Sequence, residues 1–248
     1  MKISLTLLLV LLSLVAHGQS KNYLPRIAIT NSLASGGGAG AGGVGIAAAA
    51  VTNATSGTTM TFPMAHSGDN RLLMVGVGGY DGSRVITSVT HNSLPCDLLY
   101  LTNFYDATGS AAIYYRIGPD VSGNVVVTYD DGLPQWNGAG AVILTNVNQS
   151  SPFGTFVSKY DASAAAVPGV TNTITVASGG LALDFLVAHP HNATFTPNCA
   201  ELTNHFDSGN GGIRFSWTNS VGSVDMRWVF SGADQAQSSI AVPIARVP

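Results

Sequence analysis

The chain has 248 residues, of which 46% are hydrophobic and only 9% are charged, with a formal net charge of −3. Disorder requires low hydrophobicity and high charge, so this composition excludes it. The 10 Lys+Arg against 13 Asp+Glu provide no basic surface for nucleic acid. Glu201 is the only glutamate, whereas 29 residues are glycine. Helical proteins use Glu and Lys on their exposed faces, so the composition favours an all-β protein rich in turns.

The N-terminus predicts secretion. Lys2 is followed by an apolar run over 7–15 and then by Ala16-His17-Gly18, which places small residues at the −3 and −1 positions of a signal peptidase site. The run is shorter than the ~20 residues that a membrane span requires, and no later segment supplies one. We therefore expect a signal peptide over 1–18, an extracellular or cell-surface location and no membrane span.

A strand-like arm and a tether follow the signal peptide. Residues 19–35 show a period-two pattern, in which Tyr23, Ile27 and Ile29 supply apolar side chains. Residues 36–48 are rich in glycine and alanine and predict a flexible tether. The arm has three possible fates. It pairs with a sheet edge of its own chain, it stays disordered, or it adds as a strand to a neighbouring molecule and so builds a filament.

An internal repeat organises the rest of the chain. The strand pattern that begins at Ile113 matches the one that begins at Ile213, and the turn at Gly123 matches the turn at Gly222, with an offset of 99 to 100 residues. A period of this length indicates a duplicated sandwich half or domain. We expect a first repeat over 49–149, a connector over 150–168 and a second repeat over 169–248.

Alternation within the strands predicts which side chains are buried. We expect one set to face a core and the intervening set to face solvent. The core set is Ile213, Phe215, Trp217, Val224, Met226 and Trp228, and the solvent set is Arg214, Ser216, Asp225 and Arg227. Short strands of this kind, about ten residues apart and separated by glycine turns, indicate a sandwich. The predicted fold is an all-β, antiparallel, jelly-roll-like sandwich built from two related repeats. Two tandem immunoglobulin-like domains are the alternative.

Five segments of the chain have strand and turn motifs that resemble those of known proteins. These segments are residues 70–76, 86–94, 112–119, 123–129 and 141–152. These segments resemble a widespread, largely uncharacterised group of secreted bacterial β-sandwich modules, and the resemblance covers residues 50–248. It implies a sandwich fold and an extracellular location, and it carries over no catalytic residue.

Few residues indicate chemistry. His189 and His191 could share a metal with His205 or Asp184, although short histidine-containing loops at strand ends are common, so we expect no metal site. A secreted hydrolase or lyase would need Asp184 and Glu201 to converge with these histidines. No nucleophile elbow or paired-carboxylate motif indicates such a site. We therefore expect no catalytic residue and no cofactor.

Aromatic and cysteine residues supply the remaining candidates. Six aromatic residues are predicted to lie in loops, where they could contact a carbohydrate: Tyr80, Phe104, Tyr105, Trp136, Phe153 and Tyr160. Cys96 and Cys199 occupy corresponding places in the two repeats. They either form one disulfide across the halves or fill the same buried niche twice.

The sequence is compatible with three functions: a structural protein, a binding module and an enzyme. The leading hypothesis is a non-catalytic extracellular structural or adhesive protein that associates with itself or with a cell-surface or matrix polymer. A carbohydrate-binding module is the alternative, and a secreted polysaccharide-degrading enzyme is the second alternative.

Overall fold

The computed structural model describes residues 28–29, 42–52, 57–80, 85–104, 109–131, 136–161, 169–189, 194–207, 211–231 and 236–248. Within these ranges every regular element is a β-strand, and neighbouring strands pair antiparallel. The predicted all-β antiparallel fold is therefore confirmed. No helix of the described ranges is long and apolar enough to cross a membrane.

The first half of the chain forms a two-layered sandwich. Its inner sheet has the order β1 (Ala28–Ile29), β2 (Gly45–Thr52), β10 (Trp136–Thr145), β4 (Leu72–Tyr80), β8 (Gly109–Ile117) and β7 (Asp97–Phe104). Its outer sheet has the order β3 (Thr59–Ala65), β9 (Ser122–Tyr129), β5 (Ile86–His91) and β6 (Leu94–Pro95). Apolar side chains between these sheets, among them Phe62, Leu73 and Val127, form the first outer core.

The second half forms another two-layered sandwich. Its inner sheet has the order β11 (Val157–Asp161), β18 (Ala236–Ile244), β13 (Leu181–His189), β16 (Gly211–Thr218) and β15 (Ala200–Asp207). The outer strands are β12 (Thr171–Val176), β17 (Gly222–Ser231) and β14 (Thr194–Pro197). Two apolar clusters between these layers, which contain Trp228 and Met226 respectively, form the second outer core.

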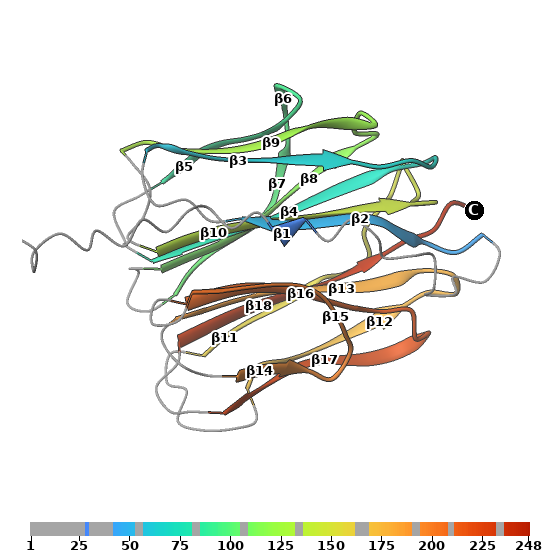
Figure 1. Cartoon of the computed structure of the whole chain (residues 1–248). Coiled ribbons are helices and arrows are strands. Elements are labelled where there is room, and N and C mark those ends of the chain that lie inside the picture. The colour runs from blue at the N-terminus through green and yellow to red at the C-terminus, as the bar shows by residue number, and fades with distance from the viewer. Residues whose placement is uncertain are drawn as a thin grey trace, which may run out of the picture.

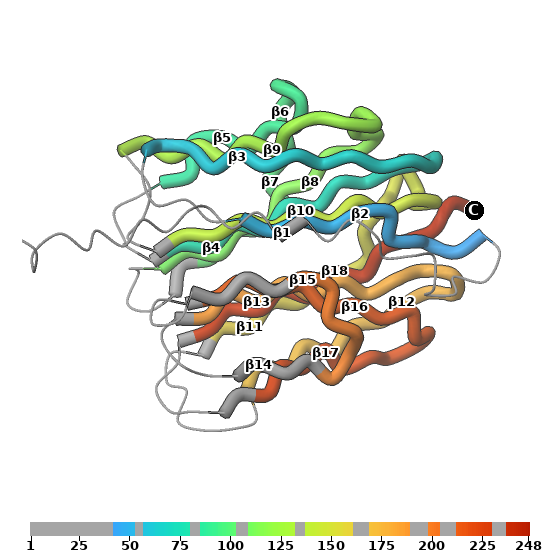
Figure 2. The backbone as a smooth tube through the Cα atoms, viewed as in Figure 1, coloured from blue at the N-terminus to red at the C-terminus, as the bar shows by residue number. Residues whose placement is uncertain are grey.

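The two sandwiches are stacked on each other through their inner sheets, which gives four layers (Figure 1). The chain passes from one sandwich to the other between β10 and β11 (Figure 2). The strand β11 lies inside the range expected for the connector, and β2 begins at Gly45, inside the range expected for the tether.

The two sandwiches have the same strand order. The order β2-β10-β4-β8-β7 corresponds to β11-β18-β13-β16-β15, and β3-β9-β5 corresponds to β12-β17-β14. The pairing register shifts after Leu98 in β7 and after Glu201 in β15, at corresponding places. When the two bulges are superimposed, Ile113 corresponds to Phe215. The sequence pattern matches Ile113 with Ile213, which is two residues away. A shift of two residues leaves the side chain on the same face of the sheet.

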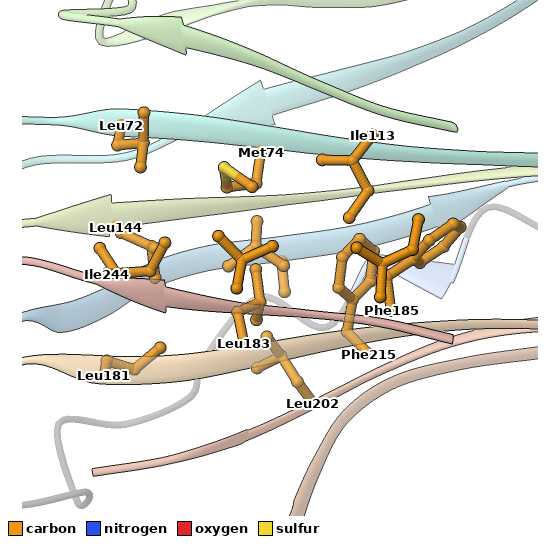
Figure 3. Packing of buried hydrophobic residues seen from close by; sticks show 14 of the residues in the cluster. Leu72, Met74, Ile113, Leu144, Leu181, Leu183, Phe185, Leu202, Phe215 and Ile244 are labelled. Carbon is orange, nitrogen blue, oxygen red and sulfur yellow. The ribbon is translucent and has the colours of Figure 1, made fainter. Parts of the chain in front are cut away.

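A central core lies between the two inner sheets. Leu72, Met74 and Ile113 extend into it from one sheet and meet Leu181, Leu183 and Phe185 from the other (Figure 3). All six side chains are buried. Full burial of an aliphatic or aromatic side chain is worth roughly 1.5–3 kcal/mol, so this layer is a large source of stability.

Part of the central core depends on a trough of glycines in the first inner sheet. The trough consists of Gly76 and Gly78 in β4 and Gly138 and Gly140 in β10, and it receives four side chains of the other sheet: Phe185, Val187, Ile213 and Phe215. A Cβ atom added to Gly76 would lie 2.4 Å from Cε2 of Phe185, and one added to Gly78 would lie 2.7 Å from Cγ1 of Val187. At Gly76, Gly78 and Gly140 an added Cβ atom would lie closer than 3.0 Å to one of these side chains, so glycine is required there for the observed packing.

The four layers correct one expectation about exposure. Arg214 and Ser216 in β16 are only 6% and 2% exposed, although the alternation placed them in solvent. The reason is that β16 lies in an inner sheet, which is covered by the central core on one face and by the second outer core on the other. Of the other positions, Ile213, Phe215, Met226 and Trp228 are buried and Asp225 and Arg227 are exposed as expected, whereas Trp217 and Val224 are only half-buried.

The two cysteines are free thiols, so the possible disulfide between them is not formed. Cys96 lies in the first outer core, and Cys199 packs against the second. Both inner sheets and the central core lie between the two cysteines, so these two corresponding residues are far apart. Burial raises the pKa of the Cys96 thiol to about 11.

We expect Gly76→Ala to lower the free energy of unfolding by about 1–3 kcal/mol, because its methyl group overpacks against the ring of Phe185. Gly138→Ala is the matched control and should cost less, since its Cβ would lie 3.3 Å from the end of Ile213. Urea unfolding measures both values. In a Phe185→Leu background the cost of Gly76→Ala should shrink, and equal costs in both backgrounds would contradict the contact.

Candidate functional site

Three aromatic candidates lie in one row of the first inner sheet. Tyr80 ends β4, Phe104 ends β7 and Trp136 begins β10, so the prediction that they lie in loops is wrong. The strands simply continue to these residues before the turns begin. The register places Trp136 opposite Tyr80, Tyr80 opposite Gly109, and Gly109 opposite Phe104. The row therefore crosses four neighbouring strands.

The other aromatic candidates are not part of this row. Tyr160 lies in β11 rather than in a loop, and it is 42% exposed. Phe153 packs edge-on against Tyr115, with ring centroids 4.8 Å apart, and so belongs to the central core. Tyr105 lies outside the described residues.

The candidate metal ligands are His189, His191 and His205. His191 lies outside the described residues, and only the backbones of His189 in β13 and His205 in β15 are described. No three metal-binding side chains gather among the residues whose side chains are described.

The two acids considered for hydrolysis have different partners. Glu201 lies on the edge strand β15, with its Oε2 3.5 Å from Nη1 of Arg214. Asp184 is fully buried and hydrogen-bonds instead to Trp228 and Ser239. The two carboxyl groups therefore belong to separate interactions.

The N-terminal arm contributes a strand to the edge of the first inner sheet. Ala28 and Ile29 form β1, which pairs antiparallel with β2 in the register Ala28 to Val51 and Ile29 to Ala50. Tyr23 and Ile27 lie outside the described residues. In the described part of the arm, the pairing is thus with an edge of its own chain.

Exposed apolar side chains mark the opposite edge of the same sheet. Leu98 and Leu101 of the edge strand β7 are 50% and 51% exposed, and Leu94 of the neighbouring β6 is also exposed. An edge strand offers main-chain groups to a partner, and apolar side chains beside it add burial. This edge has the features of an interaction surface.

A polar cluster closes one end of the first sandwich. His66 Nε2 donates a hydrogen bond to the carbonyl oxygen of Asp120 over 2.8 Å, and Nδ2 of Asn92 donates to Oδ2 of the same aspartate over 2.8 Å. His91 is fully buried, and within the described structure neither of its ring nitrogens has a hydrogen-bond partner. Burial is the main cause that lowers the pKa of His91, and the positive charge of Arg116 adds to it.

A second polar cluster lies inside the second sandwich. Asp184 accepts hydrogen bonds from Ser239 Oγ over 2.6 Å and from Trp228 Nε1 over 2.5 Å. Nδ2 of Asn172 donates to Ser239 Oγ over 2.8 Å. All four residues are fully buried. Burial raises the pKa of Asp184 to about 6, although the hydrogen bonds from Ser239, Trp228 and Asn172 oppose this shift.

Sequence reasoning missed both polar clusters. The second cluster could have been found by comparing matched positions of the two repeats. In the first sandwich Val75 pairs with Ala141, as Asp184 pairs with Ala241 in the second. By the same registers Ala139 corresponds to Ser239. At these matched positions one repeat therefore has polar residues where the other has apolar ones.

No family model, curated protein or solved structure matches the chain.

We expect acidification to weaken the fold through His91. A histidine whose pKa is lowered by folding is held neutral in the folded state, so it destabilises the fold increasingly as the pH falls below its unfolded pKa of 6.5. Unfolding free energies measured by urea at about pH 7.5 and about pH 5.5 should therefore differ less in His91→Leu than in the wild type.

At the higher pH, His91→Leu should be at least as stable as the wild type. A buried polar group without a partner costs about 1–3 kcal/mol, and the leucine removes this cost. Thr61→Ala, an exposed site in β3, is the control and should keep the wild-type pH dependence. An unchanged pH dependence in His91→Leu would show that other groups carry it.

Proposed function

We propose that the protein is a non-catalytic extracellular structural or adhesive subunit, which assembles by strand addition of its N-terminal arm. The observation that carries the proposal is the antiparallel pairing of β1 with the edge strand β2. It identifies the arm as a strand that the edge of the first inner sheet accepts. The signal-peptide pattern over 1–18 supports secretion, and membership in a group of secreted β-sandwich modules is part of the same proposal.

Exchange of the arm between molecules follows from this pairing. Ala28 and Ile29, the two residues of the arm that the structure describes, pair with β2, and the sequence that joins them to β2 is rich in glycine. The arm of a second copy can therefore occupy the same register and make the same main-chain hydrogen bonds. Such an exchange costs little free energy, and a head-to-tail contact that does not close propagates into a filament.

The opposite edge of the sheet supports an adhesive role. The exposed Leu98 and Leu101 on β7 lie away from the edge that accepts the arm, so a filament would keep them available to a surface or matrix polymer. Assembly and adhesion are thus assigned to different edges of one sheet.

We expect assembly to be lost when residues 19–35 are deleted or when Ile27 and Ile29 are both changed to Asp, because the arm then loses its apolar side chains. Light scattering and electron microscopy of the mature protein measure the size of the assemblies. The control is the double variant Asn31→Asp/Ser32→Asp, which adds the same two negative charges outside β1 and should leave assembly intact. Filaments without the arm, or a wild type that stays monomeric at high concentration, would refute strand addition.

Cysteine pairing distinguishes exchange from pairing within one chain. The register places Ala28 opposite Val51. We therefore make two single-cysteine additions, Ala28→Cys in one protein and Val51→Cys in another, both in a Cys199→Ser background. Exchange predicts a disulfide-linked dimer when the two variants are mixed and oxidised. Arms that pair only within their own chain would leave both variants monomeric under non-reducing electrophoresis.

Carbohydrate binding is the second candidate, favoured by the row that contains Tyr80, Trp136 and Phe104. Aromatic residues together with a few polar groups are typical of small-molecule sites. We expect the mature protein to be retarded in native gels that contain soluble β-glucan, and Trp136→Ala to lose at least about tenfold in affinity, which corresponds to about 1.4 kcal/mol. Tyr160→Ala, outside the row, is the control. Equal retardation of all three proteins would exclude the row as the site.

A further inference from the structure

The polar cluster inside the second sandwich brings together a hydroxyl, a carboxamide and a carboxyl group in an arrangement suited to acyl transfer. We propose that Ser239 and Asn172 react within the folded chain to form an intramolecular ester bond, and that Asp184 transfers the proton. The bond would be a covalent modification of the chain by itself, between β18 and β12. It forms inside one molecule, so its test does not depend on the proposed assembly.

The two residues that would react are already hydrogen-bonded to each other. Ser239 Oγ accepts a hydrogen bond from Asn172 Nδ2 over 2.8 Å, and the carbon atom to be attacked is bonded to that same nitrogen. The hydroxyl hydrogen of Ser239 points to Asp184 Oδ1, 2.6 Å away. The three residues extend from β18, β12 and β13, which are fixed in the sandwich. Fixed groups at contact distance react with a large entropic advantage over free ones.

The reaction balances without any other reactant. Ser239 Oγ gives its proton to Asp184 and forms a bond with Cγ of Asn172, which passes through a tetrahedral intermediate. The bond between Cγ and Nδ2 then breaks, and Asp184 returns the proton to the departing nitrogen. The products are an ester between the two side chains and one molecule of ammonia, and no atom changes its oxidation state.

Asp184 has the properties that this proton transfer needs. Its pKa of about 6 leaves it ionised at neutral pH, yet close enough to neutrality to take up a proton readily. Trp228 donates a hydrogen bond to Oδ2 of Asp184, which leaves Oδ1 for Ser239. Trp228 is therefore a positioning residue, whereas Asp184 and Ser239 take part in the reaction.

Burial protects the product. Asn172, Asp184 and Ser239 are each 0% exposed, so bulk water does not reach the ester to hydrolyse it. Exclusion of water from a site also strengthens its electrostatic interactions. Oδ1 of Asn172 has no hydrogen-bond partner within the described structure, so the carboxamide is held only through the nitrogen that leaves.

The first sandwich provides an internal comparison. Met60, Val75 and Ala139 occupy the positions that correspond to Asn172, Asp184 and Ser239, and all three are buried in the first outer core. Where the first sandwich has three apolar side chains, the second therefore has an amide, an acid and a hydroxyl linked by hydrogen bonds. The reaction is confined to the second sandwich, where it would join an outer strand to an inner one.

Peptide mass spectrometry of the mature wild-type protein tests the bond. Trypsin cuts after Lys159, Arg214, Arg227 and Arg246, which places Asn172 in peptide 160–214 and Ser239 in peptide 228–246. We expect one joined species, lighter than the sum of the two peptides by one ammonia, which hydroxylamine separates. Two separate peptides with unmodified masses would overturn the proposal.

Four variants test the roles of the residues. Ser239→Ala lacks the hydroxyl and should yield separate peptides, whereas Ser239→Thr keeps a hydroxyl and should still yield the joined species. Asp184→Asn keeps the shape but not the base, and should give at least a hundredfold less joined species than the wild type. Ser238→Ala, in the same strand, is the control and should be fully joined. Joining in Ser239→Ala would refute the ester, and full joining in Asp184→Asn would refute the role of the carboxyl group.

Discussion

The packing of the two inner sheets against each other is the contact on which the rest of the structure depends. Each inner sheet is covered on both faces, by the central core and by an outer core. The glycine trough brings the sheets close enough for Phe185 and Phe215 to fill the space between them. A chain with two doubly buried sheets has few positions for charges, which explains why only 9% of its residues are charged.

The two outer cores have diverged although their strand orders are the same. The first is apolar between its sheets, with Phe62, Leu73 and Val75 among its members. The second holds the carboxyl group of Asp184 beside Ser239 and Asn172. Burial of a polar group without a hydrogen bond is costly, and here each of these residues contacts another. The two sandwiches therefore share an architecture and differ in the chemistry of their outer cores.

Much of the fold could be predicted from the sequence, because alternation and turn residues are local signals. Met226 and Trp228 are buried and Asp225 is exposed, as period-two alternation indicates. The burial of Arg214 could not be predicted in this way, because alternation shows two faces of a strand but not whether a second sheet covers the polar one. The stacking of the repeats is a long-range contact and leaves no local pattern.

The candidate sites were harder to predict for the same reason. Trp136 and Tyr80 are far apart in the sequence and become neighbours only through the register of β10 and β4. Asp184 looked like a possible catalytic acid, yet its partners come from three other strands. The signal for that cluster lay in the comparison of the repeats, where Val75 and Asp184 occupy corresponding positions.

The glycine trough also determines which sheets can pair. The registers make Gly76 the counterpart of Phe185 and Gly78 the counterpart of Val187, and each glycine touches its own counterpart across the interface. The two halves are therefore related by an approximate twofold axis that passes near these residues. Two copies of the first inner sheet would bring glycine against glycine and leave a void, and two copies of the second would bring phenylalanine against phenylalanine. Only the unlike pair fits, so this interface favours association of a first sandwich with a second sandwich over association of two copies of either one.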